Sequence, residues 1–269
     1  MKKRVLKSLS LKAQPNKRLG LFVSRHRKPI IIGGIVLLVL VVIGSYVWWS
    51  LSNWTAVTSR SVALQQSVRN KFDSALSLSS KDKAKKLAAF TAMGQEITSK
   101  QGICDTPSLV NWQHNLEMFK KLENDCRADI VRLNTLNTRL SDITNYLHDE
   151  QVLAGLIVTA SGGQAEIDEA NLPEAANKWH TLSDKLKTLK VSSGFEAVLK
   201  RTITEVSHMD ACWQEVIAGH TAKDRTRFEK AKDELSKAYG SFKDIVQLDN
   251  ATSAPIIKQL ETSYAELTS

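Results

Sequence analysis

The stretch that decides the fold is residues 109–147, LVNWQHNLEMFKKLENDCRADIVRLNTLNTRLSDITNYL, in a chain of 269 residues. Its apolar side chains recur at intervals of three and four, which is the spacing of one face of an α-helix. The pattern is close to a heptad repeat, so it predicts a coiled-coil-like helix about 60 Å long, paired either within the chain or between chains. The seam consists of Leu109, Trp112, Leu116, Phe119, Leu122, Cys126, Ile130, Leu133, Leu136, Leu140, Ile143 and Leu147.

Apolar stripes with the same spacing lie on both sides of this segment. They predict helices over 57–78, 87–97, 172–189, 195–216 and 228–245. Asn171-Leu172-Pro173 is typical of a helix start, Thr221-Ala222-Lys223-Asp224 resembles a capping box with Asp in place of Glu, and Pro255 is expected to open a last helix. Alternating strand patterns are nearly absent. The fold class predicted is therefore all-α.

The apolar run near the N-terminus is of a different kind. No residue from Pro29 to Ser59 carries a formal charge, and the twenty residues from Ile30 to Trp49 are predominantly apolar. At about 1.5 Å per residue they span the roughly 30 Å hydrocarbon core of a membrane. The run is longer than the apolar region of a signal peptide, and no clear Ala-x-Ala site follows it. We therefore predict an uncleaved signal anchor, with Ile30, Ile35, Leu38, Val42, Trp48 and Trp49 facing lipid.

The net charge of +9 is concentrated before this run. Residues 1–28 hold ten basic and no acidic side chains, whereas 27 basic and 28 acidic residues follow. This asymmetry predicts an N-terminus in the cytoplasm and a C-terminal domain outside the plasma membrane. The tail is expected to contact anionic lipid rather than a cytoplasmic protein, and no nucleic acid is predicted as a partner. The lipid-contacting residues would be Lys2, Lys3, Arg4, Lys17, Arg18, Arg25, Arg27 and Lys28.

The predicted order along the chain follows from these segments. A basic cytoplasmic tail (1–28), a membrane anchor (29–50) and a stalk (51–60) precede an extracytoplasmic all-α domain (61–269). Ser161-Gly162-Gly163-Gln164 interrupts the helical pattern. It marks either a subdivision of the domain near 161–170 or a loop inside one bundle.

Three cysteines follow the anchor, on the side where disulfides can form: Cys104, Cys126 and Cys212. If the long helix begins at Ser108, Cys126 lies about 27 Å along it, beyond the reach of Cys104. A Cys104–Cys126 bridge would require a later start, near Leu116. Pairing of Cys212 with either of the others remains open.

Motifs that carry chemistry are scarce. His208 and Cys212 share a helix face, but neighbouring Met209 and Trp213 indicate a packed core rather than a metal site. Asp149-Glu150 and the acidic group Glu166, Asp168 and Glu169 are interpreted as solvated surface. Neither a nucleophile motif nor a phosphate-binding glycine loop occurs, so we predict a protein that is not an enzyme and holds no cofactor or metal.

The function expected is that of a scaffold or partner-binding module of the cell envelope, acting through a helix face and open to homo-oligomerisation. The alternative is an extracytoplasmic sensor or small-ligand-binding bundle that signals through the membrane helix. A sensor should have a cavity lined by Trp112, Trp179 or Trp213, whereas a scaffold should have a dry core and an exposed apolar strip.

Overall fold

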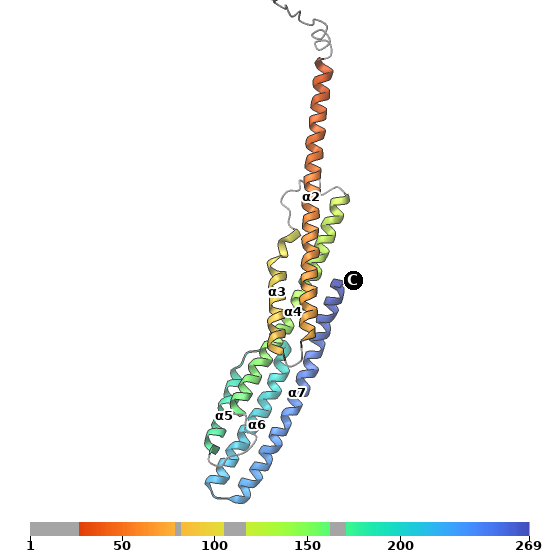
Figure 1. Ribbon diagram of the computed structural model, residues 1–269. Helices are drawn as coiled ribbons and strands as arrows, with labels where there is room; N and C mark the ends of the chain where they lie inside the picture. Colours follow the sequence, from red (N-terminus) through yellow and green to blue (C-terminus); the bar gives the residue numbers. More distant parts are fainter. Residues whose placement is uncertain (1–26, 79–81, 105–116, 162–170, 269) are drawn as a thin grey trace, which may run out of the picture. The chain divides into compact units, whose positions relative to one another are not determined.

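The computed structural model describes residues 27–78, 82–104, 117–161 and 171–268. Within these ranges the chain is helical and contains no strand, which confirms the all-α fold class. Figure 1 shows the order of the elements. They are α2 (Arg27–Ser77), α3 (Lys83–Ser99), η1 (Gln101–Cys104), α4 (Glu117–Ser161), α5 (Leu172–Thr188), η3 (Ser193–Phe195), α6 (Glu196–Thr221) and α7 (Arg225–Thr268).

The chain divides into two units, Met1–Thr55 and Ala56–Ser269. In the first unit the described part is the N-terminal half of α2, and in the second the helices pack around hydrophobic cores. The residues predicted as a stalk, 51–60, are helical and belong to α2. A subdivision was predicted near residues 161–170. Of these residues the structure describes only Ser161, the last residue of α4.

The second unit has two hydrophobic cores. The α5/α6 core joins these two helices to the C-terminal part of α4 and most of α7; its larger side chains include Tyr146, Trp179, Phe195, Met209, Trp213, Phe228 and Leu235. The α2/α3 core joins those two helices to the middle of α4 and the end of α7, with Phe72, Phe90, Met93, Leu133, Leu140, Leu260 and Leu267. Both cores therefore use α4 and α7.

The heptad-like seam of the long helix is buried inside the chain. Phe119, Cys126, Leu133, Leu136, Leu140 and Ile143 are buried, and Leu122, Ile130 and Leu147 are half-buried. The seam positions from Leu109 to Leu116 lie outside the described residues. Within the described part, the seam thus pairs with helices of the same chain.

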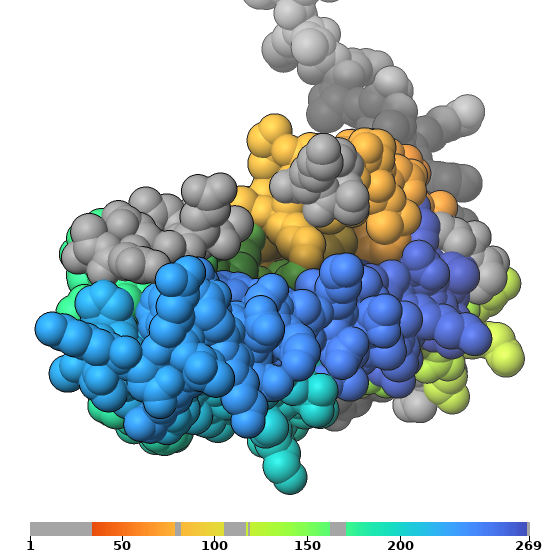
Figure 2. Space-filling view, turned by 90° about the horizontal axis from the view of Figure 1, so that it is seen from below, coloured from red at the N-terminus to blue at the C-terminus, as the bar shows by residue number. Residues whose placement is uncertain are grey.

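Helix α7 runs through both cores and is longer than the sequence suggested. Pro255 was expected to open a last helix, but this was wrong, because Pro255 lies inside α7. A proline inside a helix removes one backbone hydrogen bond and crowds the carbonyl four residues before it, here that of Ala251. Both residues are exposed, so water can reach that carbonyl, while buried Ile245 and Leu260 hold the helix on either side. Figure 2 shows α7 along one face of the molecule.

The C-terminal end of α7 packs against α2. The rings of Phe72 and Tyr264 stack with centroids 4.1 Å apart, and the Tyr264 hydroxyl donates a hydrogen bond of 2.7 Å to Oδ1 of Asp73. Burial, followed by the hydrogen bond and negative charge of Asp73, raises the pKa of Tyr264 to about 12.

Candidate functional site

One turn of α4, residues 146–150, carries polar side chains to the boundary between the two cores. Tyr146 belongs to the α5/α6 core, whereas Ile143 and Leu147 belong to or pack against the α2/α3 core. Ile256 of α7 packs against both cores. We refer to the polar side chains of Lys83, Tyr146, Asp149, Glu150, Ser192 and Asp249 as the junction.

The first contact of the junction connects α4 to α7. Tyr146 is 1% exposed, and its hydroxyl donates a hydrogen bond of 2.6 Å to Oδ1 of Asp249. Its ring packs edge-on against Phe195, with centroids 5.0 Å apart. Burial raises the pKa of the Tyr146 phenol, and the hydrogen bond and charge of Asp249 raise it further. Tyr146 is therefore a neutral donor over the physiological pH range.

The second contact connects α4 to the segment between α5 and α6. Asp149 is 9% exposed, and its Oδ2 accepts hydrogen bonds of 2.7 Å from the backbone N–H of Ser192 and 2.6 Å from the hydroxyl of the same residue. A buried carboxylate needs such partners, because an unpaired buried charge is costly. Asp149 thus fixes the position of the segment that leads into η3.

The third contact connects α4 to the start of α3. Glu150 forms an ion pair with Lys83, and its side chain is 16% exposed against 47% for that of Lys83. Burial raises the pKa of Glu150, the hydrogen bond and charge of Lys83 oppose the rise, and the charge of Asp249 adds to it. The junction therefore holds three carboxyl groups and one exposed cation, an arrangement suited to taking up and releasing a proton.

Sequence reasoning did not find the junction. The interpretation of Asp149-Glu150 as solvated surface was wrong, since neither carboxyl side chain is exposed. The seam was assigned to Leu147, which is half-buried, whereas its neighbour Tyr146 is fully buried. The available signal was a tyrosine beside the seam, one turn before two consecutive acidic residues. The acidic residues Glu166, Asp168 and Glu169 lie outside the described part.

The anchor residues lie on a helix that is long and apolar enough to cross a membrane. In α2, Ile35, Leu38, Val42, Trp48 and Trp49 are all exposed. Ile30 lies in the same helix, but its side chain is outside the described set. Of the basic residues expected to contact lipid, Arg27 and Lys28 begin α2, and Lys2, Lys3, Arg4, Lys17, Arg18 and Arg25 lie outside the described residues.

The cysteine pairing is settled by the structure. Cys104 and Cys126 form a disulfide with their Cα atoms 6.0 Å apart, and Cys212 is free and buried. The sequence argument that placed Cys126 beyond the reach of Cys104 was therefore wrong. The helix start that it assumed, at Ser108, lies outside the described residues, and the described part of α4 begins at Glu117.

The face shared by His208 and Cys212 is largely a core face. Met209 and Trp213 are buried, and the Cys212 thiol lies 3.7 Å from Nε2 of the exposed His208. Burial raises the pKa of this thiol, so it is not an activated nucleophile. In the described ranges no group of three His, Cys, Asp or Glu side chains is arranged to hold a metal ion.

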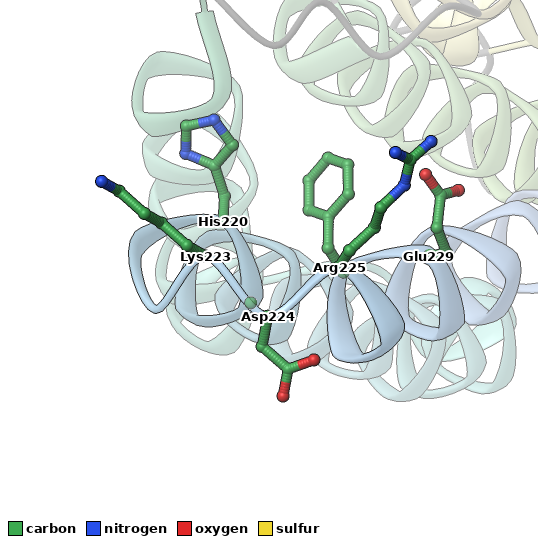
Figure 3. Close-up of a pocket in the computed structure, with 7 residues that line it drawn as sticks. His220, Lys223, Asp224, Arg225 and Glu229 are labelled. Atoms are coloured by element: carbon green, nitrogen blue, oxygen red, sulfur yellow. The ribbon is translucent and has the colours of Figure 1, made fainter.

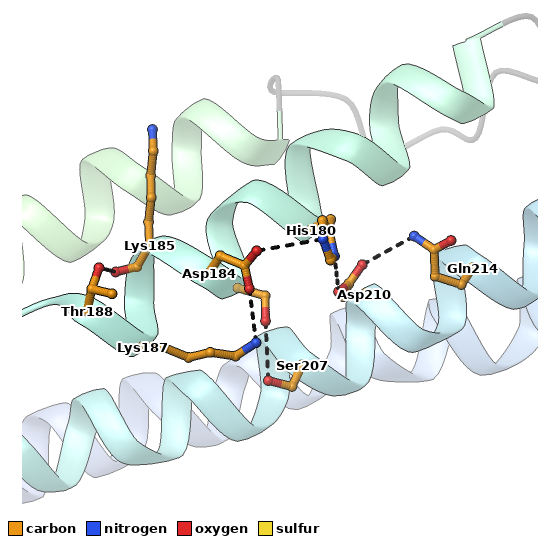
Figure 4. Close-up of polar contacts among 9 residues, drawn as sticks. His180, Asp184, Lys185, Lys187, Thr188, Ser207, Asp210 and Gln214 are labelled. Carbon is orange, nitrogen blue, oxygen red and sulfur yellow. Dashed lines mark hydrogen bonds and ion pairs between the residues drawn. The ribbon is translucent and has the colours of Figure 1, made fainter.

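His180 on α5 lies between two carboxylates on the outside of the α5/α6 core, as Figure 4 shows. Its Nδ1 is 2.9 Å from Oδ2 of Asp210 on α6, and its Nε2 is 3.6 Å from Oδ2 of Asp184. The hydrogen bond and charge of Asp210, followed by the charge of Asp184, raise the pKa of His180. The contact is a pH-dependent link between α5 and α6 on an exposed surface.

The turn between α6 and α7 lines a hollow of about 410 Å³ (Figure 3). The backbone N–H groups of Lys223 and Asp224 donate to the carbonyls of His220 and Gly219, which is the Schellman pattern, and Lys223 has a φ of 53°. The predicted capping box was wrong: Thr221 ends α6, and Asp224 caps α7 by accepting from the N–H of Arg227 at 3.0 Å. The hollow is thus a by-product of a tight turn.

No known family model matches this chain, and neither the curated proteins nor the solved structures contain a significant match to it.

Proposed function

We propose that this chain is a single-pass protein of the cell envelope, anchored by α2, whose helical domain is a scaffold or partner-binding module outside the plasma membrane. The observation that carries the proposal is the apolar N-terminal part of α2. From Ile35 to Ile43 every large apolar side chain is at least 47% exposed. Burying that surface in hydrocarbon is strongly favourable, and a helix satisfies its own backbone groups there.

The disulfide supports an extracytoplasmic location for the domain. The bond between Cys104 and Cys126 lies C-terminal to the anchor. Structural disulfides form and persist in oxidising compartments and are rare in the cytosol. The ten basic residues before the anchor favour the same orientation.

The packing of the domain favours a scaffold. Trp179 and Trp213 are 2% and 4% exposed and lie in the α5/α6 core, where their rings pack against other side chains rather than opening onto solvent. Trp112 is outside the described residues. On α7, Val246 and Ile257 are exposed and offer apolar contacts to a partner.

A sensor is the second candidate, and the junction favours it. Buried ionisable groups between two packed cores are costly, and in some proteins such groups serve conformational specificity or a switch. Such a protein would pass a change in the domain along α2 to the tail.

The topology is tested with single cysteines in a Cys212→Ser background. Ser10→Cys lies in the tail and Lys190→Cys on the exposed loop after α5. On intact spheroplasts a membrane-impermeant maleimide should label Lys190→Cys at once and Ser10→Cys only after permeabilisation. The reverse pattern, or equal labelling of both, would overturn the proposal.

The partner-binding role is tested by placing a photo-crosslinking amino acid at Val246 or Ile257 in cells. Lys190, exposed but not apolar, is the matched control position. A scaffold gives a discrete cross-linked product from each of the two α7 positions, and Val246→Lys abolishes the product formed from Ile257. If products form equally at Lys190, or at none of the positions, the scaffold role fails and the sensor candidate gains weight.

A further inference from the structure

We propose that Glu150 and Asp249 form a proton-operated link between α4 and α7 at the boundary of the two cores. When Glu150 is protonated, its carboxyl group donates a hydrogen bond to Asp249 and holds the two long helices together. When Glu150 is ionised, two carboxylates face each other and the link weakens. This goes beyond the proposed function, and it holds for the folded domain whatever its orientation in the membrane.

The geometry of the junction carries the proposal. The Tyr146 hydroxyl is 2.6 Å from Oδ1 of Asp249, so the Asp249 carboxylate is fixed close to α4, one turn from Glu150. Tyr146 and Glu150 lie one turn apart on α4, so the Asp249 carboxylate that Tyr146 holds lies on the Glu150 side of the helix, where its negative charge opposes ionisation of Glu150. Because Tyr146 uses its only proton on Asp249, a further hydrogen bond between the two carboxyl groups requires one of them to carry a proton.

Burial and the charge of Asp249 favour protonation of Glu150, and the ammonium of Lys83 opposes it. From α3 only the Lys83 ammonium approaches Glu150, and the Lys83 side chain is 47% exposed. From α7 the facing groups are Asp249 and, next to Tyr146, Ser253. On α4 itself, Asp149 already accepts two hydrogen bonds from Ser192 and is satisfied as a carboxylate. Glu150 has one cation beside it, the largely exposed Lys83 ammonium, and burial of the Glu150 side chain opposes its ionisation.

The direction of the pH dependence follows from the raised pKa of Glu150, which has burial as its largest cause. A carboxyl group with a folded-state pKa above its unfolded value stabilises the folded state fully below the unfolded pKa. That contribution is lost as the pH rises through the folded pKa. The junction should therefore be tightest at acidic pH and loosen as the pH rises through the raised pKa of Glu150.

The test is amide hydrogen exchange of the full-length protein in detergent micelles, followed by mass spectrometry from about pH 5 to about pH 8 and corrected for intrinsic exchange. Peptides covering residues 143–153 and 246–256 report the junction. Their protection should fall with rising pH by a factor that approaches tenfold per pH unit within the transition, the limit for one proton. Peptides of α6 should show no such transition.

Three substitutions separate the link from a general pH effect. Glu150→Gln should abolish the transition. Lys83→Met removes the cation that lowers the pKa of Glu150, so the transition should move to higher pH. Asp249→Asn removes the charge that raises it, so the transition should move to lower pH. Glu234→Gln on α7 is the control. Lys237 lowers the pKa of Glu234, so the pH dependence of any stability that Glu234 contributes is opposite in sign to that of Glu150.

The proposal is overturned if the junction peptides of Glu150→Gln keep the wild-type pH profile. If Glu150→Gln does not fold, the other two variants decide. Opposite shifts of the midpoint in Lys83→Met and Asp249→Asn support the link, and an unchanged midpoint in both refutes it.

Discussion

The hydrogen bond between Tyr146 and Asp249 gives the sharpest stability prediction, because the chain contains a second tyrosine–aspartate pair for comparison. Tyr146 donates at 2.6 Å from a side chain that is 1% exposed, whereas Tyr264, which is half-buried, donates at 2.7 Å to the exposed Asp73. Both pairs connect α7 to another helix. They differ in burial, and the Tyr146 hydroxyl also lies 3.0 Å from the backbone carbonyl oxygen of Asp249.

The magnitude follows from the charge of the acceptor and from its surroundings. A hydrogen bond to a charged group contributes about 1.5–3 kcal/mol, and a buried acceptor that loses its donor retains its desolvation cost. Tyr146→Phe keeps the ring and its packing on Phe195. It should therefore lower the free energy of unfolding by about 2 kcal/mol, whereas Tyr264→Phe should lower it by about 0.5 kcal/mol because water replaces the lost donor at Asp73.

The assay is urea unfolding of the full-length protein in detergent, followed by circular dichroism. A double-mutant cycle isolates each pair: Tyr146→Phe with Asp249→Ala, and Tyr264→Phe with Asp73→Ala. We expect a coupling energy of about 2 kcal/mol for the buried pair and about 0.5 kcal/mol for the exposed pair. Equal couplings would refute the claim that burial at the junction strengthens this contact.

Three further predictions concern other parts of the domain. Cys104→Ser should lower the free energy of unfolding by about 3 kcal/mol, the loop-entropy value for a bridge of this separation, and under reducing conditions the difference from wild type should vanish. Cys212→Ser is the control: it keeps the bridge, so reduction should destabilise it as much as it destabilises wild type. Lys223→Gly should raise the free energy of unfolding by about 1 kcal/mol in the same assay, because glycine adopts the left-handed conformation without the steric cost that Lys223 carries. The pKa of His180, followed by NMR titration, should fall when Asp210→Asn removes its main partner, and an unchanged pKa would contradict the assignment. The stabilisation from this contact is present below the unfolded histidine pKa and is lost as the pH rises through the higher folded value.

Periodicity predicted the helices because burial decides where they form. The stripe of α5 with Leu172, Trp179, Leu182 and Leu186, preceded by Pro173, is buried as expected, and the stripe of α6 is buried likewise. Each stripe is a local signal. An amphipathic helix needs only some apolar partner, whichever helix supplies it.

The junction could not be predicted, because it depends on which helices meet. Nothing in the local sequence of Asp149-Glu150 indicates that Ser192 and Lys83, 43 and 67 residues away, supply their partners. Pro255 misled for a related reason. Its helix-breaking tendency is a local cost, and the packing of α7 in both cores outweighs it. The disulfide between Cys104 and Cys126 was also missed, because the sequence argument against it assumed a helix start at Ser108, in a part of the chain outside the described residues.

The sharing of α4 and α7 between the two cores has a consequence for how the protein folds and how it can be altered. A cut after α4 leaves the α2/α3 core without Leu260 and Leu267, and a cut before α5 deprives the α5/α6 core of Tyr146 and Leu153. Neither half of the chain is thus an autonomous folding module, and domain 56–269 should melt in a single cooperative transition. A deletion within this domain would therefore unfold the whole domain at once, so an activity of the domain can be assigned to particular residues only by point substitution.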